Sequence, residues 1–402
     1  MMKETEMKRV PKLRFPEFTD DWEQRKLGEI YTERNERGND NLEILSVSIH
    51  HGVSSGELDS NVLGKNVKRS EDKSLYKHVY EGDLVFNMMR AWQGAIGIVK
   101  NEGMISPAYI SAIPNKNVYS KFMDYCLRRD EVINQINNLS YGVTDFRKRL
   151  YWNGFTKVNI MLPSVQEQDK LTELFHNLDK FITLQQRKIK NLKSLKKGMM
   201  QKLFNQEVRF KADDGSEFPE WEKKPFGDVV SEFKVKTKVE DEDTLLSCAI
   251  NGMFLNSELF GHQRGQSNIG YLKIKKGTLI LSAQNLHLGN ANVNLRFEHG
   301  IISPAYKTYD IVGCLAEYMS QWAKWDMTKQ FFYNATTVGA SECRRNVDWN
   351  MLYSQLFAVP FLAEQQKIAE CLSALDDVIE KQKATLAAWE ELKKGLLQQM
   401  FV

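Results

Sequence analysis

The chain repeats its own sequence once, and this duplication limits the possible folds more than any other feature of its 402 residues. The heptapeptide GMISPAY at residues 103–109 returns as GIISPAY at residues 300–306, a shift of 197 positions. Further matches follow at the same shift, without a gap, to the C-terminus. They pair Trp152-Asn153 with Trp349-Asn350, Pro163 with Pro360, Glu167-Gln168 with Glu364-Gln365, and Leu195-Lys196-Lys197-Gly198 with Leu392-Lys393-Lys394-Gly395. Collinear matches at one shift indicate an internal duplication, so we expect two similar halves.

Each copy consists of a mixed part followed by a helical part. In the mixed part, short apolar runs such as LVF at 84–86 and TLIL at 278–281 alternate with Gly and Asn turn signals and with short helical patterns. The helical part, residues 166–204 and 363–401, contains no proline and only one glycine in each copy. The fold class that we expect is α+β, with two similar α/β domains joined by two long helices that form an antiparallel coiled coil. The expected boundaries are 1–165 for the first domain with an N-terminal arm, 166–207 for a central helix, 208–362 for the second domain and 363–402 for a C-terminal helix.

The two helical segments carry a heptad stripe in the same register. Its positions step alternately by four and three residues, and both stripes hold a glutamine and a lysine at equivalent places. Residues 166–204 contain 9 basic and 4 acidic side chains, whereas 363–401 contain 5 basic and 7 acidic, so their net charges are opposite. This favours pairing of the helices with each other over two separate amphipathic helices that lie on their own domains. The expected seam residues are Leu171, Leu178, Ile182 and Gln185 in the first helix and Leu375, Ile379, Gln382 and Trp389 in the second.

The start of each long helix has a signal of its own. Pro163 and Pro360 stand just before the helical segments. Ser164 and Glu167 have the spacing of a capping box, in which each side chain bonds the backbone N–H of the other residue, but the second copy lacks the serine. A glycine inside each helix costs about 1 kcal/mol. Because the stripe continues beyond these glycines, we expect both helices to be unbroken.

The patterns of several enzyme classes are absent from the sequence. There is no G-x-x-x-x-G-K-[ST] phosphate loop and no glycine-rich turn of the kind that binds a nucleoside cofactor. The repeated SPAY at 106–109 and 303–306 resembles the NPPY element of adenine methyltransferases only superficially, and its recurrence without a cofactor loop favours a structural turn. The histidines do not have metal-site spacing. We therefore expect no catalytic residue, no metal site and no cofactor in this chain.

Cysteine usage and hydropathy suggest a compartment. The five cysteines are odd in number and scattered, with no C-x-x-C pair, which argues against a disulfide framework. All apolar runs are shorter than the roughly 18 residues that a membrane span needs. We expect a cytoplasmic protein. Its formal charge of +3 is small, so any attraction to nucleic acid must come from local clusters of charge.

Two amide-rich and basic loops occupy matching places in the copies, each after a predicted strand. Arginine pairs bidentately with guanine, and glutamine or asparagine pairs with adenine, so these side chains suit the edges of DNA bases. An ordinary polar loop is the alternative interpretation. The candidate base-reading residues are Arg90 and Gln93 in the first copy and Gln284, Asn285 and His287 in the second.

A second pair of loops lies farther along each copy, at 142–149 and 339–345, and combines a glycine, a hydroxyl and paired cations. Such loops can hold phosphates through backbone N–H groups and charge. A solvated salt bridge between the acidic residue of each loop and its adjacent arginine remains the alternative. The candidate DNA-backbone residues are Thr144, Arg147 and Lys148 in the first copy and Ser341, Arg344 and Arg345 in the second.

Taken together, these features resemble the specificity subunit of type I restriction-modification enzymes. The resemblance covers essentially the whole chain. It includes a Phe-Pro-Glu and Trp-Glu opening in each copy (15–17 with 22–23, and 218–220 with 221–222) and two long helices that begin after Pro with Glu-Gln and contain Leu-Lys-Lys-Gly. Each motif is weak alone, whereas the combination is specific.

The resemblance implies two target recognition domains, residues 20–163 and 217–360, that each read one half of a split, asymmetric double-stranded DNA site. The helix pair would set the unread gap. Two modification (methyltransferase) subunits would supply S-adenosylmethionine and methylate adenine at N6, and restriction (translocase/nuclease) subunits would use ATP and Mg²⁺. The alternative from another class is a duplicated coiled-coil adaptor that binds protein partners; steep salt dependence of DNA binding would exclude it.

Overall fold

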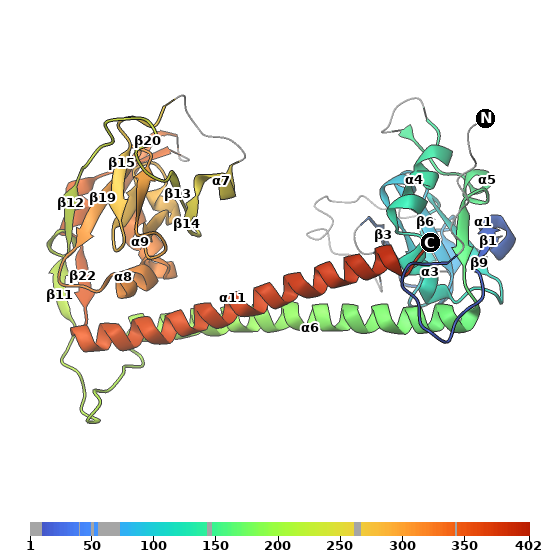
Figure 1. Ribbon diagram of the computed structural model, residues 1–402, viewed down its shortest axis with the longest axis horizontal. Coiled ribbons are helices and arrows are strands. Elements are labelled where there is room, and N and C mark those ends of the chain that lie inside the picture. The colour runs from blue at the N-terminus through green and yellow to red at the C-terminus, as the bar shows by residue number, and fades with distance from the viewer. Residues whose placement is uncertain are drawn as a thin grey trace. The chain divides into compact units, whose positions relative to one another are not determined.

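The computed structural model describes residues 10–39, 41–49, 52–54, 73–142, 147–260, 267–341 and 344–402, with the backbone alone at 338–341 and 344. The chain forms two compact units. The first comprises Met1–Leu184 and Leu386–Val402, and the second comprises Gln185–Thr385. Each unit therefore contains one mixed domain together with part of α6 (Val165–Phe204) and part of α11 (Leu362–Gln399), as Figure 1 shows.

A four-stranded antiparallel sheet of order β2-β9-β6-β7 forms the centre of the first unit. Ala112 of β9 faces Glu33 of β2 on one side and Leu84 of β6 on the other. Apolar side chains of the sheet pack with the short helices into one core. The elements are β2 (Tyr31–Arg34), β6 (Leu84–Asn87), β7 (Ile96–Ile98), β9 (Tyr109–Pro114), α3 (Ser120–Cys126), α4 (Asp130–Leu139) and α5 (Trp152–Phe155).

The described part of the first domain also contains three two-stranded antiparallel sheets: β1 with β10, β3 with β4, and β5 with β8. The β1–β10 pair joins the start of the domain to the strand that leads into α6, so the domain is closed at its two chain ends. The bounds are β1 (Glu23–Lys26), α1 (Leu27–Ile30), β3 (Val47–Ser48), β4 (Gly52–Val53), β5 (Lys77–Val79), η1 (Ala91–Gln93), β8 (Gly103–Ile105) and β10 (Asn159–Leu162).

The second unit repeats this arrangement strand by strand. Its central sheet has the order β12-β19-β16-β17, and Glu232 of β12 faces Tyr309 of β19 as Glu33 faces Ala112 in the first unit. The pairs β11–β22, β13–β14 and β15–β18 correspond to the three small sheets. The central elements are β12 (Val230–Phe233), β16 (Leu279–Ser282), β17 (Ala291–Val293), β19 (Tyr306–Ile311), α8 (Ala316–Ala323), α9 (Asp326–Asn334) and α10 (Trp349–Ser354).

The second domain also contains the described hairpin β20–β21 and the short helix α7. Its remaining bounds are β11 (Glu222–Pro225), η3 (Phe226–Asp228), β13 (Leu246–Ala249), β14 (Gly252–Leu255), α7 (Asn256–Leu259), β15 (Leu272–Lys275), η4 (Leu286–Leu288), β18 (His299–Ile302), β20 (Thr336–Ser341), β21 (Arg344–Val347) and β22 (Leu356–Val359).

An aromatic side chain from the end of a long helix completes each domain core. Phe401, just beyond α11, stacks on Phe122 of the first unit with ring centroids 5.3 Å apart. Phe204, the last residue of α6, lies 5.7 Å from Tyr318 of the second unit. Phe204 and Phe401 stand 197 positions apart and are equivalent in the two copies. The helix that follows one domain in the sequence therefore ends in the core of the other.

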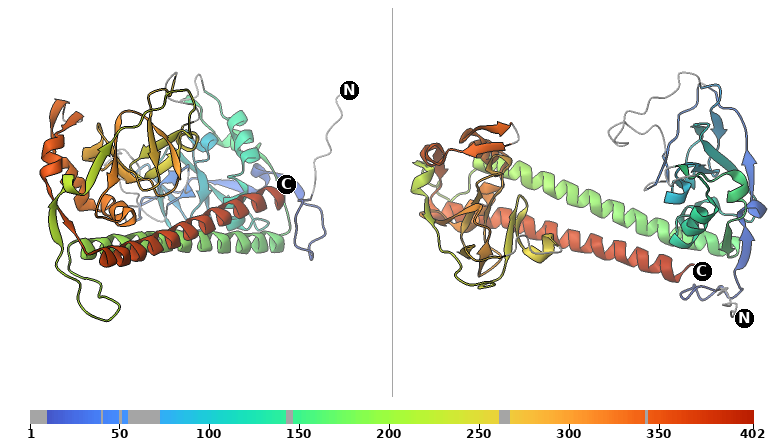
Figure 2. Two further views of the ribbon diagram at one scale, coloured as in Figure 1. Left: turned by 60° about the vertical axis from the view of Figure 1, so that its left-hand side comes forward. Right: turned by 90° about the horizontal axis from the view of Figure 1, so that it is seen from above.

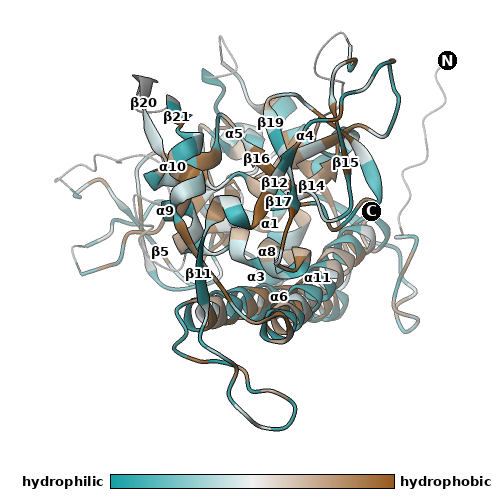
Figure 3. Cartoon of the chain, turned by 90° about the vertical axis from the view of Figure 1, so that its left-hand side faces the viewer, coloured by the Kyte–Doolittle hydropathy of each residue, from teal (hydrophilic) through white to brown (hydrophobic). Residues whose placement is uncertain are grey.

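The two long helices are continuous through their glycines. α6 has 40 residues and α11 has 38, within two residues of the segments that the sequence predicted. A side chain at Gly198 or Gly395 would meet no atom within 4 Å, so the absence of a side chain there serves no packing purpose. In the described part of the chain, no helix combines the length and apolar character required to cross a membrane, and Figure 3 shows α6 and α11 with alternating hydrophilic and hydrophobic residues.

In each unit, α6 and α11 pack in opposite chain directions (Figures 1 and 2). In the second unit, Gln185 contacts Gln382 and Lys196 contacts Asp376, so the partner number falls as the α6 number rises. In the first unit, Lys393 bonds Asp179 at 2.5 Å. Of the predicted seam residues, Leu171, Leu178 and Ile379 are buried, while Ile182, Gln185, Leu375, Gln382 and Trp389 are half-buried.

The charged pairs of the seam occur at equivalent positions of the two copies. Asp179 with Lys393 and Asp376 with Lys196 are the same pair of positions, made once in each unit. The lysines that the heptad stripe placed in the seam therefore have an acidic partner on the facing helix. Each helix supplies one acid and one base to these two pairs, so the pairs themselves do not depend on the opposite net charges of the segments.

The predicted capping box forms only in part. Ser164 Oγ accepts a hydrogen bond from the backbone N of Glu167 at 3.3 Å, but the Glu167 carboxylate accepts from Nε and Nη2 of Arg14, at 2.8 and 2.7 Å. Trp22 Nε1 also donates to it, at 3.3 Å. The capping-box prediction was therefore wrong for the glutamate, because a cation and an indole of the N-terminal arm bind its buried carboxylate.

The second copy makes the same attachment. Glu364 is fully buried and accepts from Arg209 Nε at 3.0 Å and from Trp221 Nε1 at 3.0 Å. The adjacent glutamines act alike: Gln168 accepts from the backbone N of Tyr119, just before α3, and Gln365 from that of Leu315, just before α8. The repeated Glu-Gln pair thus ties each long helix to its own domain.

Candidate nucleic-acid interface

The first candidate base-reading loop is a tight turn directly after β6. Asn87 Oδ1 accepts the backbone N–H of Met89 at 3.0 Å, and η1 ends at Gly94 with a left-handed φ of +99°. Ala91 is fully buried between them and anchors the turn. Arg90 and Gln93, on either side of this anchor, are both exposed. The turn therefore presents the two predicted side chains to solvent.

The corresponding turn in the second domain is η4, after β16. Leu286 takes the place of Ala91 as the buried anchor, and Gln284 and Asn285 are exposed. Asn285 stands at the position of Arg90, and His287 stands at the position of Trp92 in η1. The framework of the turn is thus shared, whereas its side chains differ between the copies.

His287 differs from the other four candidates because it is only 6% exposed. Burial lowers its pKa, and the nearby cations Arg345 and Lys329 lower it further. The imidazole is therefore packed inside the domain, where it supports the turn. The expectation that His287 faces a base edge is not met in this structure, since its place in η4 points the ring towards the domain.

The second loop of the first domain carries cations beside the first loop. Thr144 lies outside the described residues, and Arg147 is exposed. Lys148 Nζ donates to Asn137 Oδ1 at 3.2 Å and lies 5.6 Å from the centre of the Trp92 ring. Lys148 thus connects the cationic loop to the candidate base-reading turn.

In the second domain the same stretch forms the hairpin β20–β21, where the sequence predicted a loop. Ser341 faces Arg344 in the strand register, with an irregularity between Val338 and Ser341. Arg345 donates from Nε to Thr336 Oγ1 at 2.7 Å and from Nη2 to the Thr336 carbonyl at 2.8 Å. Two donors of this guanidinium are therefore engaged within the hairpin.

The structure brings the two sequence-distant loops together in each domain. In the first, the backbone N of Leu150 donates to the carbonyl of Met88 at 2.9 Å. Lys148 over Trp92 and Arg345 beside His287 are the same two positions of the repeat. Base-reading and backbone-binding candidates thus lie on adjacent segments, which no local sequence pattern shows.

Two exposed tyrosines next to these loops were not predicted. Tyr141 is 57% exposed and Tyr151 is 36% exposed, and their rings stack with centroids 5.0 Å apart. They bracket the cationic loop on both sides. Aromatic residues that flank a basic segment are a signal of nucleic-acid binding, so the sequence contained this clue.

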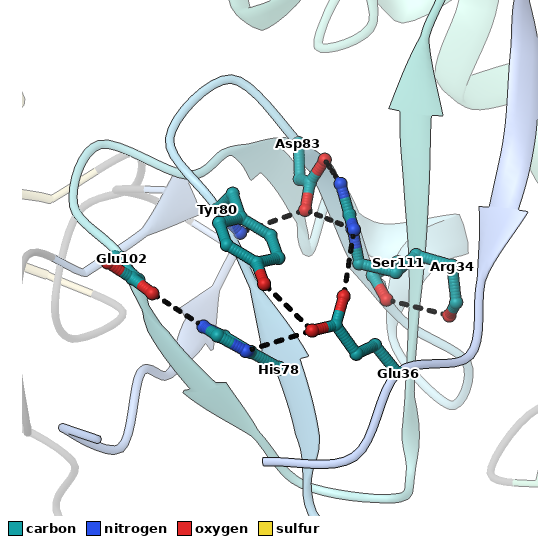
Figure 4. Close-up of polar contacts among 7 residues, drawn as sticks. All are labelled: Arg34, Glu36, His78, Tyr80, Asp83, Glu102 and Ser111. Atoms are coloured by element: carbon teal, nitrogen blue, oxygen red, sulfur yellow. Dashed lines mark hydrogen bonds and ion pairs between the residues drawn. The ribbon is translucent and has the colours of Figure 1, made fainter. Parts of the chain in front are cut away.

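A polar network on the first domain was also not predicted (Figure 4). Arg34 donates through Nε and Nη2 to Asp83 at 2.7 and 3.1 Å. The Tyr80 hydroxyl donates to Glu36 at 2.7 Å, and this bond lowers the pKa of the Glu36 carboxyl. Asp83 also accepts the backbone N–H of Tyr80 at 2.9 Å. The other members are His78, Glu102 and Ser111.

This network belongs to the framework of the domain. Thr278 stands at the position of Asp83 and makes the same turn-closing bond, with its Oγ1 accepting from the backbone N of Lys275. Phe233 stands at the position of Arg34. The turn before the central strand is therefore closed by a side-chain oxygen in both domains, and only the first adds an ion pair. Within the described residues, no group of three His, Cys, Asp or Glu side chains is placed to hold a metal ion.

Comparisons with known proteins agree with this arrangement. Residues 19–194 match the family model of the type I restriction modification DNA specificity domain. The chain is 23% identical over 304 residues to the MjaVIII type I restriction enzyme specificity subunit of Methanocaldococcus jannaschii, which covers 70% of this chain and 69% of that subunit. A second chain of that archaeon, named as the putative type I restriction enzyme MjaX specificity subunit, is 23% identical over 410 residues. The match covers 95% of this chain and 93% of that one.

Two solved structures share the fold. The S subunit of a type I restriction-modification system from M. genitalium matches with a TM-score of 0.56 at 13% identity, covering 98% of this chain and 99% of that one. The second structure comes from work on complex assembly and conformational transition of the type I R-M system. It matches with a TM-score of 0.55 at 17% identity, covering 94% of this chain and 97% of that one. Both likenesses extend over both copies and both long helices.

Proposed function

We infer that this chain is the specificity subunit of a type I restriction-modification enzyme, and that each of its two domains reads one half of a split DNA sequence. It directs adenine methylation or restriction by partner subunits and is not catalytic alone. The family match, the relatives and the shared fold support this function.

One observation supports the division of readout more than any other: the two copies share a framework and differ in the side chains that it presents. The turns η1 and η4 both follow a central strand, both have a buried anchor and both end at a left-handed glycine. Arg90 in one turn is replaced by Asn285 in the other. These side chains form hydrogen bonds with different bases, arginine with guanine and asparagine with adenine. Two such domains on one chain suit an asymmetric, two-part site.

The cationic segments supply binding that does not depend on sequence. Arg147 and Arg344 stand at equivalent positions, next to the base-reading turns, and arginine binds phosphate strongly. Lys148 and Arg345 have a second task, since each contacts its own domain. In this proposal Arg147 and Arg344 anchor the DNA backbone while the turns select the bases.

The partners and cofactors follow from the proposed function. Two modification subunits bring S-adenosylmethionine and the methyl-transfer site, and restriction subunits bring the ATP- and Mg²⁺-dependent steps. The helices α6 and α11 set the number of unread base pairs between the half-sites. No residue of this chain acts on the methyl group or on the scissile phosphate.

The decisive experiment is methylome sequencing of cells that carry this chain together with its modification subunit. We expect methylated adenines in one two-part sequence with a constant gap. The purified chain alone should transfer no methyl group from S-adenosylmethionine, and addition of the modification subunit should restore transfer. Methylation by the rigorously purified chain alone would overturn the proposal. The absence of salt-dependent binding to duplex DNA would also overturn the proposal, and it would favour a protein-binding adaptor.

A further inference from the structure

The first unit contains a hollow of about 480 Å³ that the proposed DNA contacts do not use. Three aromatic side chains line it, Tyr141, Tyr151 and Trp152, together with Met88 and the charged residues Glu33 and Lys77. Flat rings and two opposite charges in one hollow form an unusual lining for a surface depression. The combination suits a flat, polar, heteroaromatic group.

The equivalent positions of the second domain hold larger side chains that bond one another. Lys307 Nζ lies 2.7 Å from Glu232 Oε2 and 4.2 Å from the centre of the Trp349 ring. The Tyr353 hydroxyl donates to the same carboxylate oxygen at 3.2 Å. Glu232 therefore binds a cation and a phenol in this domain, and the cation also lies over Trp349.

In the first domain these two contacting side chains are replaced by smaller ones. Ile110 stands at the position of Lys307, and Thr156 stands at the position of Tyr353. Glu33, the counterpart of Glu232, keeps its place on the outer strand of the sheet. No hydrogen bond or ion pair joins its carboxylate to another side chain of the described residues. The first domain therefore keeps the glutamate and the tryptophan but not the cation and the phenol that contact them in the second. Tyr141 and Tyr151 line the hollow where the second copy has Val338 and Asp348.

Lys77 provides a donor next to this acceptor. Its Nζ donates to the Tyr109 carbonyl at 3.1 Å, and its ammonium has two further donors. Burial lowers the pKa of Lys77, while the charge of Glu33 opposes this effect. In the second domain Leu272 occupies this position and is buried. The acceptor and donor pair thus belongs to the first domain.

The hollow adjoins the candidate interface. Tyr141 and Tyr151 bracket the loop that carries Arg147, and Met88 belongs to the turn that carries Arg90. The bond between Leu150 and Met88 ties these segments together. A nucleic acid held by Arg147 and Arg90 would therefore pass the mouth of the hollow.

We propose that this hollow receives one unstacked base of the bound DNA, and that the base carries an exocyclic amino group. The base is cytosine or adenine. Its amino group donates to Glu33, its adjacent ring nitrogen accepts from Lys77, and its ring lies against the aromatic side chains. In this pose thymine has no amino group for Glu33, and guanine would place its protonated N1 opposite the Lys77 ammonium. Enzymes that read an unstacked base combine these same elements, an aromatic stack and hydrogen bonds to the pairing edge.

This inference rests on the proposed function and deepens it. It predicts that the half-site read by the first domain is distorted at one base pair, whereas the other half-site remains stacked. It also makes Glu33 a specificity-determining residue, although Glu33 lies on a strand and not on a loop.

The test uses the chain assembled with its modification subunits and duplexes that contain the mapped site. 2-Aminopurine is placed in turn beside each base, because its fluorescence rises when a stacking neighbour leaves. We expect a rise beside one cytosine or adenine of the first half-site that is not the methylated adenine. Glu33→Gln should weaken binding to this site by roughly 5- to 150-fold, the range of one base-specific contact. The matched variant Glu232→Gln should leave the signal unchanged.

A second variant separates occupation of the hollow from damage to the fold. Thr156→Tyr copies into the first domain the phenol that contacts the glutamate in the second, and leaves the buried Ile110 unchanged. We expect this variant to melt as the natural chain does and to lose the fluorescence rise. A rise that persists in this well-folded variant would overturn the proposal, as would the absence of any rise outside the methylated adenine.

The source of the base and the proposed function are tested separately. Free adenosine and cytidine should show no saturable binding by equilibrium dialysis, and saturable binding would overturn the assignment to a DNA base. Specific binding and methylation with no unstacked base in the first half-site would refute this inference alone. If the natural chain, assembled with its modification subunits, showed no sequence-specific DNA binding, the proposed function itself would be refuted.

Discussion

Gln185 Nε2 donates hydrogen bonds to Oε1 of Gln382 at 2.8 Å and to the Gln382 carbonyl at 3.0 Å, and these two glutamines are the same position in the two copies. A contact between equivalent residues of a duplicated chain is the internal counterpart of a contact on the axis of a symmetric dimer. It fixes which turn of α6 faces which turn of α11, because no other pairing of the stripes lets both amides meet.

Replacing one member of this pair should cost more than replacing both. Gln185→Leu leaves the Gln382 amide without its partner in a half-buried seam, so we expect a loss of about 1–3 kcal/mol in the free energy of unfolding. The double variant with Gln382→Leu should recover most of this loss, because two leucines pack in a heptad seam. Denaturant melts of the two single variants and the double variant measure the coupling. Equal, additive losses would show that the pair does not interact.

Base readout and backbone binding should separate by mutation. Arg90→Ala removes an exposed side chain of the first turn, so it should relax preference in one half-site only, by about 1–3 kcal/mol if the contact is bidentate. Arg147→Ala should weaken binding to all sequences and reduce the salt slope. Gln93→Ala and Arg344→Ala serve as matched variants of each kind. A change of preference in both half-sites after Arg90→Ala would contradict this assignment.

Stability should depend on pH through His287. Its pKa is lowered in the folded chain, so below the unfolded value of 6.5 the unfolded chain binds more protons than the folded chain. The contribution of this group to stability is therefore lost as the pH falls below about 6.5 and is present above it. His287→Gln should flatten the fall of melting temperature between pH 7.5 and pH 5.5. An unchanged pH profile in this variant would show that another group is responsible.

The long helices should act as the spacer between the half-sites. Four residues inserted near Lys190, with four more at the facing level of α11, lengthen the pair by roughly 6 Å at about 1.5 Å per residue. At about 3.4 Å per base pair this adds one to two base pairs. Four residues also overshoot one full turn by roughly 40°, close to the rotation of one base pair.

Methylome sequencing of that variant decides the matter. We expect the two half-site sequences to persist and the gap to grow. An unchanged gap in an active enzyme would mean that the helices do not set the spacing, and altered half-sites would mean that they take part in reading bases.

Several features of this protein were predictable because they repeat or are periodic along the chain. The shift of 197 positions predicted two similar domains, and the strand-by-strand match of the two central sheets confirms it. The heptad stripe predicted that Gln185 and Gln382 belong to a seam, and they bond each other. Such signals are local, since side-chain period and turn residues depend on neighbours in sequence. The family resemblance, which rests on the same repeats, was correct as well.

Other features depended on contacts between residues far apart in sequence, which local patterns do not encode. The position of His287 predicted a polar loop residue, but packing of η4 buries it. Glu167 has the spacing of a helix cap, but Arg14 reaches it from 153 positions away and takes its carboxylate. The hollow beside Glu33 is lined by side chains as far apart in sequence as Lys77 and Trp152, which meet only when the domain is assembled. The sequence alone determined the duplicated domains and the long helices, because repeats and periodicity depend on the order of residues along the chain. The tertiary structure decided burial, contact partners and cavities, because these depend on which distant side chains pack together.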